Sequence, residues 1–288
     1  MNEIIHFTKA EGAQNDFVIV DDRSGNLSDD TRRHFAQLTA HSRKGVGSDG
    51  CIFIDTSDTH DFTMSFYNPD GSVGSMCGNG GRCAALYAVQ NGIAGQQMSF
   101  DVLGRSYRAA VEGNNVRLSF PAPVVIEHDI PLQCGDEHCT VDFIDTGAPH
   151  VLLFSDQLPA SMHGAYDELD MSHIGTSLRW HTRFAPRGAN VNVLERDGEE
   201  IRIRTLEKGV EGETEACGTG TLAAGMSAHL RYGIPSPITL RTHGDDVLSV
   251  HFSPHGDSKS DPSYFERDLV LEGPAHLVYE GCIQLRDA

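Results

Sequence analysis

The chain has 288 residues, of which 39% are hydrophobic, and its 41 acidic residues against 22 Lys and Arg give a formal net charge of −19 at pH 7. Such a charge repels polyanions and argues against nucleic acid or an anionic membrane surface as a partner. No segment approaches the roughly 20 apolar residues of a membrane span, and the first residues lack the basic and apolar regions of a secretion signal. We therefore expect a cytoplasmic protein.

Short segments with alternating apolar and β-branched residues, bounded by glycine, predict a mostly antiparallel sheet. In chain order these strand segments are 3–12, 16–23, 51–55, 62–68, 98–104, 115–120, 150–156, 189–196 and 201–209. Ordinary helices are predicted at about 33–41 and about 160–180. This mixture of elements indicates the α+β class.

Two further predicted helices share one motif. "CGNGGRCAALYAVQNG" begins at Cys77 and "CGTGTLAAGMSAHLRYG" begins at Cys217, and both open with Cys-Gly-x-Gly and continue through small residues. They end at Gly92 and Gly233, which suit the left-handed position just after a helix.

The spacing of these motifs reveals an internal repeat. The two cysteines are 140 positions apart, and "MSFDVLG" and "ITLRTHG" keep the same offset. "GAQNDFVIV" at Gly12 corresponds to "GAPHVLLF" at Gly147, 135 positions further on. The repeat predicts two homologous halves, 1–122 and 123–271, each a sheet wrapped around one central helix. A pseudo-twofold relation between the halves would let Cys77 and Cys217 face each other.

Two such cysteines suit a particular chemistry. A helix N-terminus lowers the pKa of a thiol, and its N–H groups bind carboxylates, to which Gly78 and Gly218 allow close approach. Inverting a stereocentre requires removing a proton from one face of a carbon and returning one to the other face. One deprotonated and one protonated thiol can do this without moving around the carbon.

The remaining cysteines have simpler interpretations. An odd total of seven in a chain of this length indicates reduced thiols rather than a disulfide framework. We predict that Cys51, Cys83 and Cys282 are small buried hydrophobic side chains. Cys134 and Cys139 flank His138, but this single ligand pair falls short of the usual zinc pattern. We therefore predict no metal.

"MCGNGGRC", "ACGTGT" and "GAQNDFVIVD" resemble the diaminopimelate epimerase family, which is related to proline racemase, and the resemblance covers essentially the whole chain. It implies a cofactor-independent amino-acid epimerase that converts LL-diaminopimelate to the meso form for lysine and cell-wall synthesis. It also implies two β-barrel-like domains, each around a central helix, with a C-terminal tail (about 272–288) returning to the first domain. A homodimer is the family's usual state.

The resemblance also implies roles for individual residues. Cys77 resembles the proton donor and Cys217 the acceptor in the LL-to-meso direction, and His150 and Glu207 match the pair that tunes the thiols. The substrate-binding residues implied are Asn15, Asn68, Gly78, Asn79, Asn190, Glu207, Lys208, Gly218 and Thr219.

Three positions depart from the common family pattern. Ala148 and Lys208 stand where "GNPH" and "ERG" have asparagine and arginine, Gly50 replaces a glutamine, and one residue is added before Cys217. The resemblance implies that the family's asparagine and arginine at positions 148 and 208 bind the remote end of the substrate, so a racemase of another amino acid remains an alternative. "GVGSDG" at 45–50 fits a nucleotide-binding glycine pattern, but a strand rather than a helix follows it. A thiol–disulfide oxidoreductase would carry C-x-x-C, which does not occur in the sequence.

Overall fold

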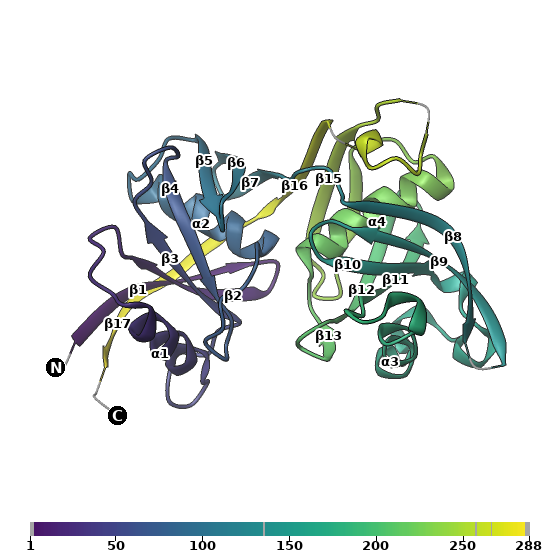
Figure 1. The fold of residues 1–288 in the computed structure, drawn as a ribbon, viewed down its shortest axis with the longest axis horizontal. Coiled ribbons are helices and arrows are strands. Elements are labelled where there is room, and N and C mark those ends of the chain that lie inside the picture. Colours follow the sequence, from purple (N-terminus) through teal and green to yellow (C-terminus); the bar gives the residue numbers. More distant parts are fainter. Residues whose placement is uncertain (1–2, 135, 257, 266, 286–288) are drawn as a thin grey trace. The chain divides into compact units, whose positions relative to one another are not determined.

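The structure is a computed structural model that describes residues 3–134, 136–256, 258–265 and 267–285. The chain divides into two compact units (Figure 1). One contains the residues up to Ser119 together with those from Gly273 onward, and the other is Phe120–Glu272. None of the helices in the described ranges combines the length and the apolar character that crossing a membrane requires.

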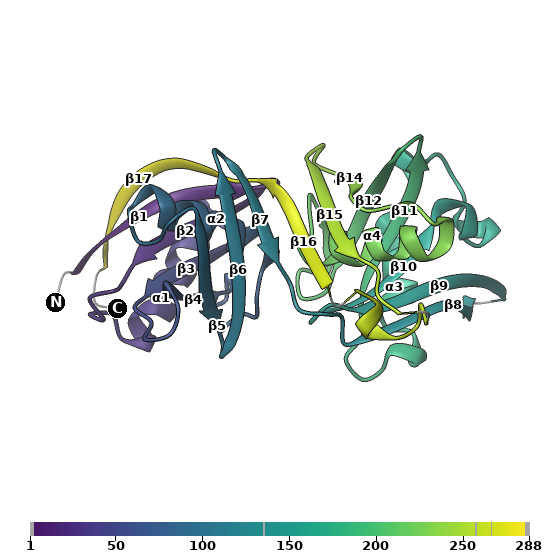
Figure 2. The same ribbon diagram turned by 90° about the horizontal axis from the view of Figure 1, so that it is seen from above.

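The first unit is built on a sheet in which the last strand of the chain pairs with the first (Figure 2). In spatial order the strands are β17 (His276–Leu285), β1 (Glu3–Gly12), β2 (Asn15–Asp21), β3 (Gly50–Asp55), β4 (Phe62–Tyr67), β5 (Gln97–Val102), β6 (Arg105–Glu112) and β7 (Asn115–Ser119). The pairs β2–β3 and β4–β5 are parallel and the others are antiparallel.

The second unit repeats this plan. Its strands follow the order β8 (Val125–Cys134), β9 (Glu137–Asp145), β10 (Pro149–Phe154), β11 (Asn190–Asp197), β12 (Glu200–Glu207), β14 (Ile238–Arg241), β15 (Val247–Ser253) and β16 (Arg267–Pro274), and β13 (Gly212–Thr214) also pairs with β12. Here β10–β11 and β12–β14 are the parallel pairs. Because both units place parallel pairs at equivalent points of the chain, the structure is a mixed α/β fold with two repeated halves, as the sequence repeat predicts.

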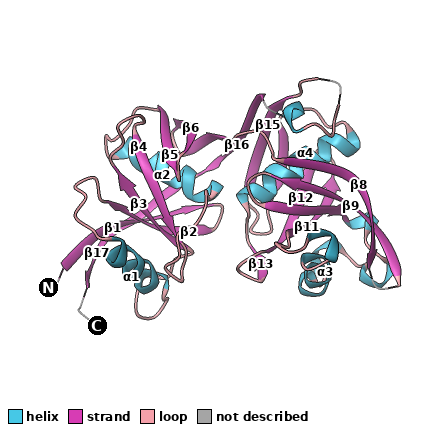
Figure 3. Cartoon of the chain, viewed as in Figure 1, coloured by secondary structure: helices cyan, strands magenta, loops and turns pink. Residues whose placement is uncertain are grey.

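A central helix lies against the strands of each unit, and Figure 3 shows both helices among their strands. In the first unit α2 (Gly78–Gln90) packs on β1, β2, β3, β6, β7 and β17; in the second α4 (Gly218–Tyr232) packs on β9, β10, β11, β12, β14 and β15. Eleven residues of each helix are buried. Most of them are small or apolar, as an enclosed helix requires, and the Gly and Ala residues of both motifs let the strands approach. The buried polar exceptions are Asn79 and Arg82 in α2 and Thr221 and Ser227 in α4.

The ends of both central helices follow the sequence prediction. Cys77 and Cys217 are the residues that precede the first helical turn. Gly92 and Gly233 have φ of +66° and +67°, the left-handed conformation that a glycine adopts without strain.

Two other helix predictions are wrong in their bounds. The helix predicted at about 33–41 is α1 (Asp29–Ala40), which begins earlier because the Ser28 side chain accepts a hydrogen bond from the N–H of Thr31. The helix predicted at about 160–180 is α helical only in α3 (Met171–Arg179). Short 3₁₀ turns precede it, and extended backbone at His163 and Leu169 ends each of them.

The nine predicted strand segments all fall on strands, and the structure adds others, including β6, β8, β9 and β17, that the residue pattern does not indicate. Isolated 3₁₀ turns complete the described elements: Ser155–Gln157, Ala160–Met162, Tyr166–Glu168, Thr182–Phe184 and Pro262–Phe265.

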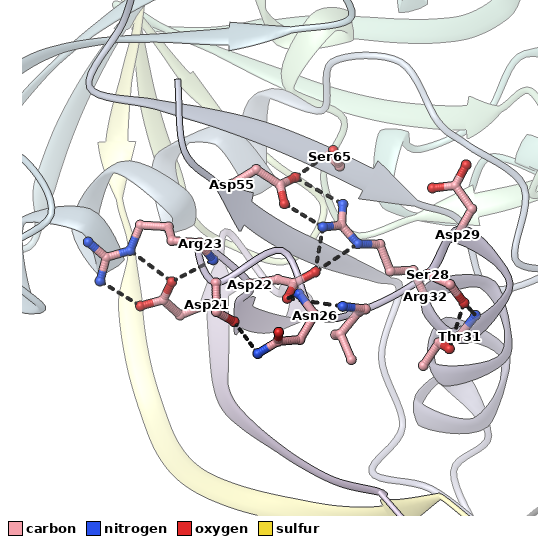
Figure 4. Close-up of polar contacts among 12 residues, drawn as sticks. Asp21, Asp22, Arg23, Asn26, Ser28, Asp29, Thr31, Arg32, Asp55 and Ser65 are labelled. Carbon is pink, nitrogen blue, oxygen red and sulfur yellow. Dashed lines mark hydrogen bonds and ion pairs between the residues drawn. The ribbon is translucent and has the colours of Figure 1, made fainter. Parts of the chain in front are cut away.

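An ion-pair network fastens α1 to the sheet (Figure 4). The Arg32 guanidinium donates to the Asp22 carboxylate from Nη2 at 2.5 Å and from Nε at 3.1 Å, and to Asp55 from Nη1 at 2.9 Å. Asp22 follows β2 and Asp55 ends β3, so one side chain joins the helix to two neighbouring strands. The Ser65 hydroxyl on β4 adds a hydrogen bond to Asp55.

Candidate active site

The N-terminus of α2 holds the first of the two cysteines. The Cys77 backbone is extended, and its sulfur accepts a hydrogen bond from the N–H of Gly80 at 3.4 Å. Hydrogen bonds of this kind stabilise the anionic form of the acceptor. The sulfur thus lies at the positive end of the helix dipole with a donor aimed at it.

Two of the predicted asparagines lie beside this helix end. The Asn79 amide, which is buried, donates to Oδ1 of Asn15 at 3.1 Å, and Asn15 in turn donates to Oδ2 of Asp49 at 2.6 Å. Oδ1 of Asn79 is buried and has no hydrogen-bond partner among the described residues. The structure therefore brings Asn15, Asn79 and Cys77 together in one unit.

Asn68 lies on the turn that follows β4. Its amide donates to the Ser72 hydroxyl at 2.9 Å, and its backbone N–H donates to the Ser72 carbonyl. These bonds shape the turn on which Asn68 lies.

Gly50, where the resembled family has glutamine, faces an aromatic ring. A Cβ at this position would lie 2.3 Å from Cε2 of Phe66. The Phe66 ring therefore occupies the space that a side chain at position 50 would need. A larger residue at position 50 would require the ring to move.

The N-terminus of α4 holds the second cysteine in different surroundings. The sulfur of Cys217 lies 3.6 Å from the Thr219 hydroxyl, which lies 3.0 Å from Nε2 of His150. His150 comes from β10, so a strand and a helix each supply part of this cluster. The second unit thereby brings together three of the predicted residues.

His150 is fully buried, and burial lowers its pKa to about 3. The imidazole is therefore neutral at physiological pH. Its Nδ1 lies 3.2 Å from the amide nitrogen of Asn192, whose Oδ1 accepts from the Thr205 hydroxyl at 3.0 Å. Sequence reasoning missed both Asn192 and Thr205. The available signal was the "NVNV" alternation, which puts Asn190 and Asn192 on one face of a buried strand, where each amide requires partners.

Asn190 connects two chain segments near His150. Its amide nitrogen donates to the Pro149 carbonyl at 3.0 Å, and its Oδ1 accepts from the backbone N–H of Lys208 at 2.7 Å. Asn190 thus positions the turn that begins at Glu207, whose carboxylate accepts from the Thr214 hydroxyl at 3.1 Å. The loop before Cys217, with its added residue, forms the β12–β13 hairpin.

Lys208 lies among charged side chains of both signs. Burial and the positive charges of Arg187 and Arg179 lower the pKa of its amino group, against the opposite effect of Asp145 and Glu211. Arg187 is largely exposed and lies 3.5 Å from Oδ2 of Asp145, whereas Arg179 is buried and bound to Glu211 at 2.7 Å. No local sequence pattern connects either arginine with Lys208, because both precede it by 20 residues or more.

The other cysteines divide into two groups. Cys51 and Cys83 are buried as predicted, and burial raises the pKa of both thiols, which makes them poor nucleophiles. The prediction for Cys282 is wrong: it is exposed on β17, where the strand alternates in exposure.

The segment weighed as a zinc pattern forms the hairpin of β8 and β9. The Cys134 side chain lies outside the described residues. On β9 His138 is exposed and Cys139 is buried, because successive strand residues point to opposite faces of a sheet.

Each half therefore presents a thiol at the start of a buried helix. The first N–H groups of a helix have no partner within the helix and suit a carboxylate. The fold is shared with a hydroxyproline epimerase from Agrobacterium vitis, at a TM-score of 0.71 and 13% identity, covering 99% of this chain and 93% of that one. The family model for diaminopimelate epimerase matches residues 7–120 and 143–260.

Full-length relatives agree with this match. The chain is 39% identical to a diaminopimelate epimerase of Chlorobaculum tepidum, over 95% of this chain and 99% of the relative. It is 33% identical to one of Aquifex aeolicus, over 96% and 97% of the two chains. The chain belongs to the diaminopimelate epimerase family.

Proposed function

We propose that the protein is a diaminopimelate epimerase, an isomerase that interconverts LL-diaminopimelate and meso-diaminopimelate in the synthesis of lysine and peptidoglycan precursors. The observation that carries this proposal is the cysteine that precedes the central helix in each repeated half, Cys77 before α2 and Cys217 before α4. The family membership supplies the substrate.

The reaction needs two groups in opposite protonation states. In the LL-to-meso direction the Cys217 thiolate takes the proton from the α-carbon and becomes a thiol, while the Cys77 thiol delivers its proton to the opposite face and becomes a thiolate. The roles reverse for the opposite direction. The chain supplies both groups itself, so the proposed reaction uses no pyridoxal phosphate or other cofactor.

The substrate carboxylate next to the reacting carbon has a natural binding place. The N–H groups of Gly78 and Asn79 begin α2, and those of Gly218 and Thr219 begin α4. These donors stabilise the charge that develops on the carboxylate oxygens when the α-proton leaves. We assign the tuning of the thiols to His150 and Glu207; His150 contacts Thr219, which in turn contacts the Cys217 sulfur.

We assign substrate binding to Asn15, Asn68, Asn190, Glu207 and Lys208, and among them the remote amino-acid head of the substrate to Lys208. Lysine is a point charge and cannot reproduce the two-pronged hydrogen bonding of arginine. The nearby guanidinium of Arg187 supports the assignment, because it adds a second cation to the neighbourhood of Lys208. A racemase of another amino acid is the alternative, and the replacements at Ala148 and Lys208 are the observation in its favour.

We further propose that the protein acts in the cytoplasm as a homodimer. Its two halves are β-barrel-like domains, 1–122 with the tail from about 272 and 123–271, that arose by internal duplication. The common strand order of the two units supports this history.

The test is incubation with LL-diaminopimelate in D2O without added cofactor, following the ratio of epimers and the deuterium at the α-carbon together. The proposal expects the meso form to appear with deuterium at the inverted carbon. A panel of single-headed amino acids, including histidine, is the control. Turnover of one of these in place of diaminopimelate would favour the alternative, and absence of exchange with every substrate would refute the proposal.

A further inference from the structure

A line of polar side chains leads from the interior of the second unit, where Asn192 and His150 are buried, through the half-buried Thr219 to the Cys217 sulfur. Asn192 on β11 contacts His150 on β10, His150 contacts Thr219 at the start of α4, and Thr219 contacts Cys217. The three distances along this line are 3.2, 3.0 and 3.6 Å. The direction in which each hydrogen bond is donated decides whether the Thr219 hydroxyl donates a hydrogen bond to the sulfur.

The orientation of the Asn192 amide follows from its neighbours. Its nitrogen lies 3.0 Å from the carbonyl oxygen of Val151, which can only accept a hydrogen bond. The NH2 group must therefore face Val151, and the same nitrogen lies against Nδ1 of His150. On the other side of the amide, Oδ1 accepts from the Thr205 hydroxyl. Every polar atom of this fully buried side chain is thus engaged.

This orientation determines the tautomer of His150. Because the Asn192 nitrogen only donates, Nδ1 of the neutral ring must accept, and the ring proton resides on Nε2. Nε2 then donates to the Thr219 hydroxyl oxygen. With its oxygen accepting from the ring, the hydroxyl retains its own proton as a donor for the sulfur at 3.6 Å.

Close packing keeps this arrangement in place. Gly220 is the third residue of α4, and a Cβ there would lie 2.7 Å from Oδ1 of Asn192 and 3.3 Å from Cε1 of His150. Only glycine at this position lets the helix lie against both side chains.

We propose that Asn192 is a positioning residue for Cys217: it holds His150 in the tautomer with the proton on Nε2, so that the Thr219 hydroxyl donates to the Cys217 sulfur. This stabilises the thiolate of Cys217, whereas Cys77 receives a backbone N–H from Gly80 instead. The inference rests on the proposed function only for the use of that thiolate as the base. The hydrogen-bond arrangement itself makes no reference to a substrate.

The first experiment reads the tautomer directly. Long-range proton–nitrogen NMR of protein labelled with 15N-histidine, with the His150 signals assigned by their loss in a His150→Gln variant, distinguishes the two neutral tautomers. We expect a neutral ring with its proton on Nε2 at pH 7. A proton on Nδ1, or a cationic ring, would overturn the proposal.

The second experiment reads the sulfur. Alkylation by iodoacetamide over a range of pH, quantified by mass spectrometry of the separate cysteine peptides, gives the apparent pKa of each thiol. Thr219→Val removes the hydroxyl at nearly constant shape and should raise the value for Cys217 by about one unit, a tenfold loss of thiolate below that pH. Thr219→Ser keeps the hydroxyl and should leave the apparent pKa of Cys217 close to its wild-type value. Cys77 is the internal control, with an unchanged profile.

The role of Asn192 is tested by Asn192→Leu in the same assay. Loss of the donor to Nδ1 should raise the apparent pKa of Cys217 in the same direction as Thr219→Val, and NMR should show protonation at Nδ1 appearing. An unchanged Cys217 profile in Thr219→Val would overturn the proposal even if Asn192→Leu fails to fold. Since neither readout uses turnover, an inactive enzyme with the expected tautomer would count against the proposed function alone.

Discussion

The Arg32 network allows a stability prediction whose control, the pair of Arg23 and Asp21, lies close by in the sequence. Arg32 is 11% exposed and its partner Asp22 is 2% exposed, whereas the neighbouring pair of Arg23 and Asp21 is 40% and 32% exposed. Each arginine donates hydrogen bonds to one aspartate from two of its nitrogens, Nε and Nη2 (Figure 4). The two arginines therefore differ in burial and in the second carboxylate, Asp55, to which Arg32 also donates.

Replacing Arg32 by methionine keeps an unbranched apolar stem but removes the guanidinium, which leaves the Asp22 carboxylate without its counter-charge. Removing one member of a buried pair costs about 3–5 kcal/mol. Asp22 keeps the backbone N–H groups of Asn26 and Leu27, and Asp55 keeps Ser65. We therefore expect the lower end of that range, about 3 kcal/mol. Arg23→Met should cost less than about 1 kcal/mol, as exposed pairs do.

Urea unfolding monitored by circular dichroism, together with calorimetry to separate the transitions of the two units, measures both variants. The Arg32→Met protein should unfold about 10 °C lower in the transition of the first unit, while the Arg23→Met protein stays close to wild type. Equal effects of the two substitutions would refute the argument that burial makes the Arg32 network important.

Three further predictions concern the proposed active site. Cys77→Ser and Cys217→Ser should each reduce epimerisation by at least 10²–10⁴-fold, because a serine hydroxyl is too weak an acid to replace a thiol; near-normal turnover of either variant would contradict the two-thiol mechanism. Lys208→Ala should cost on the order of 2–4 kcal/mol in kcat/KM and Lys208→Arg far less, since only alanine leaves the remote carboxylate without a cation; a wild-type kcat/KM for the alanine variant would remove Lys208 from the substrate site. Because the pKa of His150 is lowered to about 3 in the folded protein, only the unfolded chain binds its proton between about pH 6.5 and pH 3. As pH is lowered across that window, folding stability should therefore decrease by about 1.4 kcal/mol per pH unit more in wild type than in His150→Gln; parallel stability profiles in urea titrations would argue against a buried neutral imidazole.

Much of the framework could be derived from local signals in the chain. Cys77 and Cys217 precede helices of small residues that end at left-handed glycines, and the constant offset of about 140 residues reveals two halves. The helix ends depend on near neighbours in the sequence, a cap at one end and a glycine at the other, and the repeat is visible because the same local motif occurs twice. Short-range patterns also located nine strands, because alternation is a property of the strand itself.

Only the tertiary structure decided which buried polar groups meet. Asn192, Thr205 and His150 come from three neighbouring strands, and their contacts follow from the register of those strands, which no local pattern states. The cations near Lys208 likewise come from distant parts of the chain. A buried amide or imidazole must find hydrogen-bond partners wherever the fold places them. The sequence by itself could therefore indicate the two thiols, whereas the direction of the hydrogen bonds that reach Cys217 depended on the packed sheet and helix.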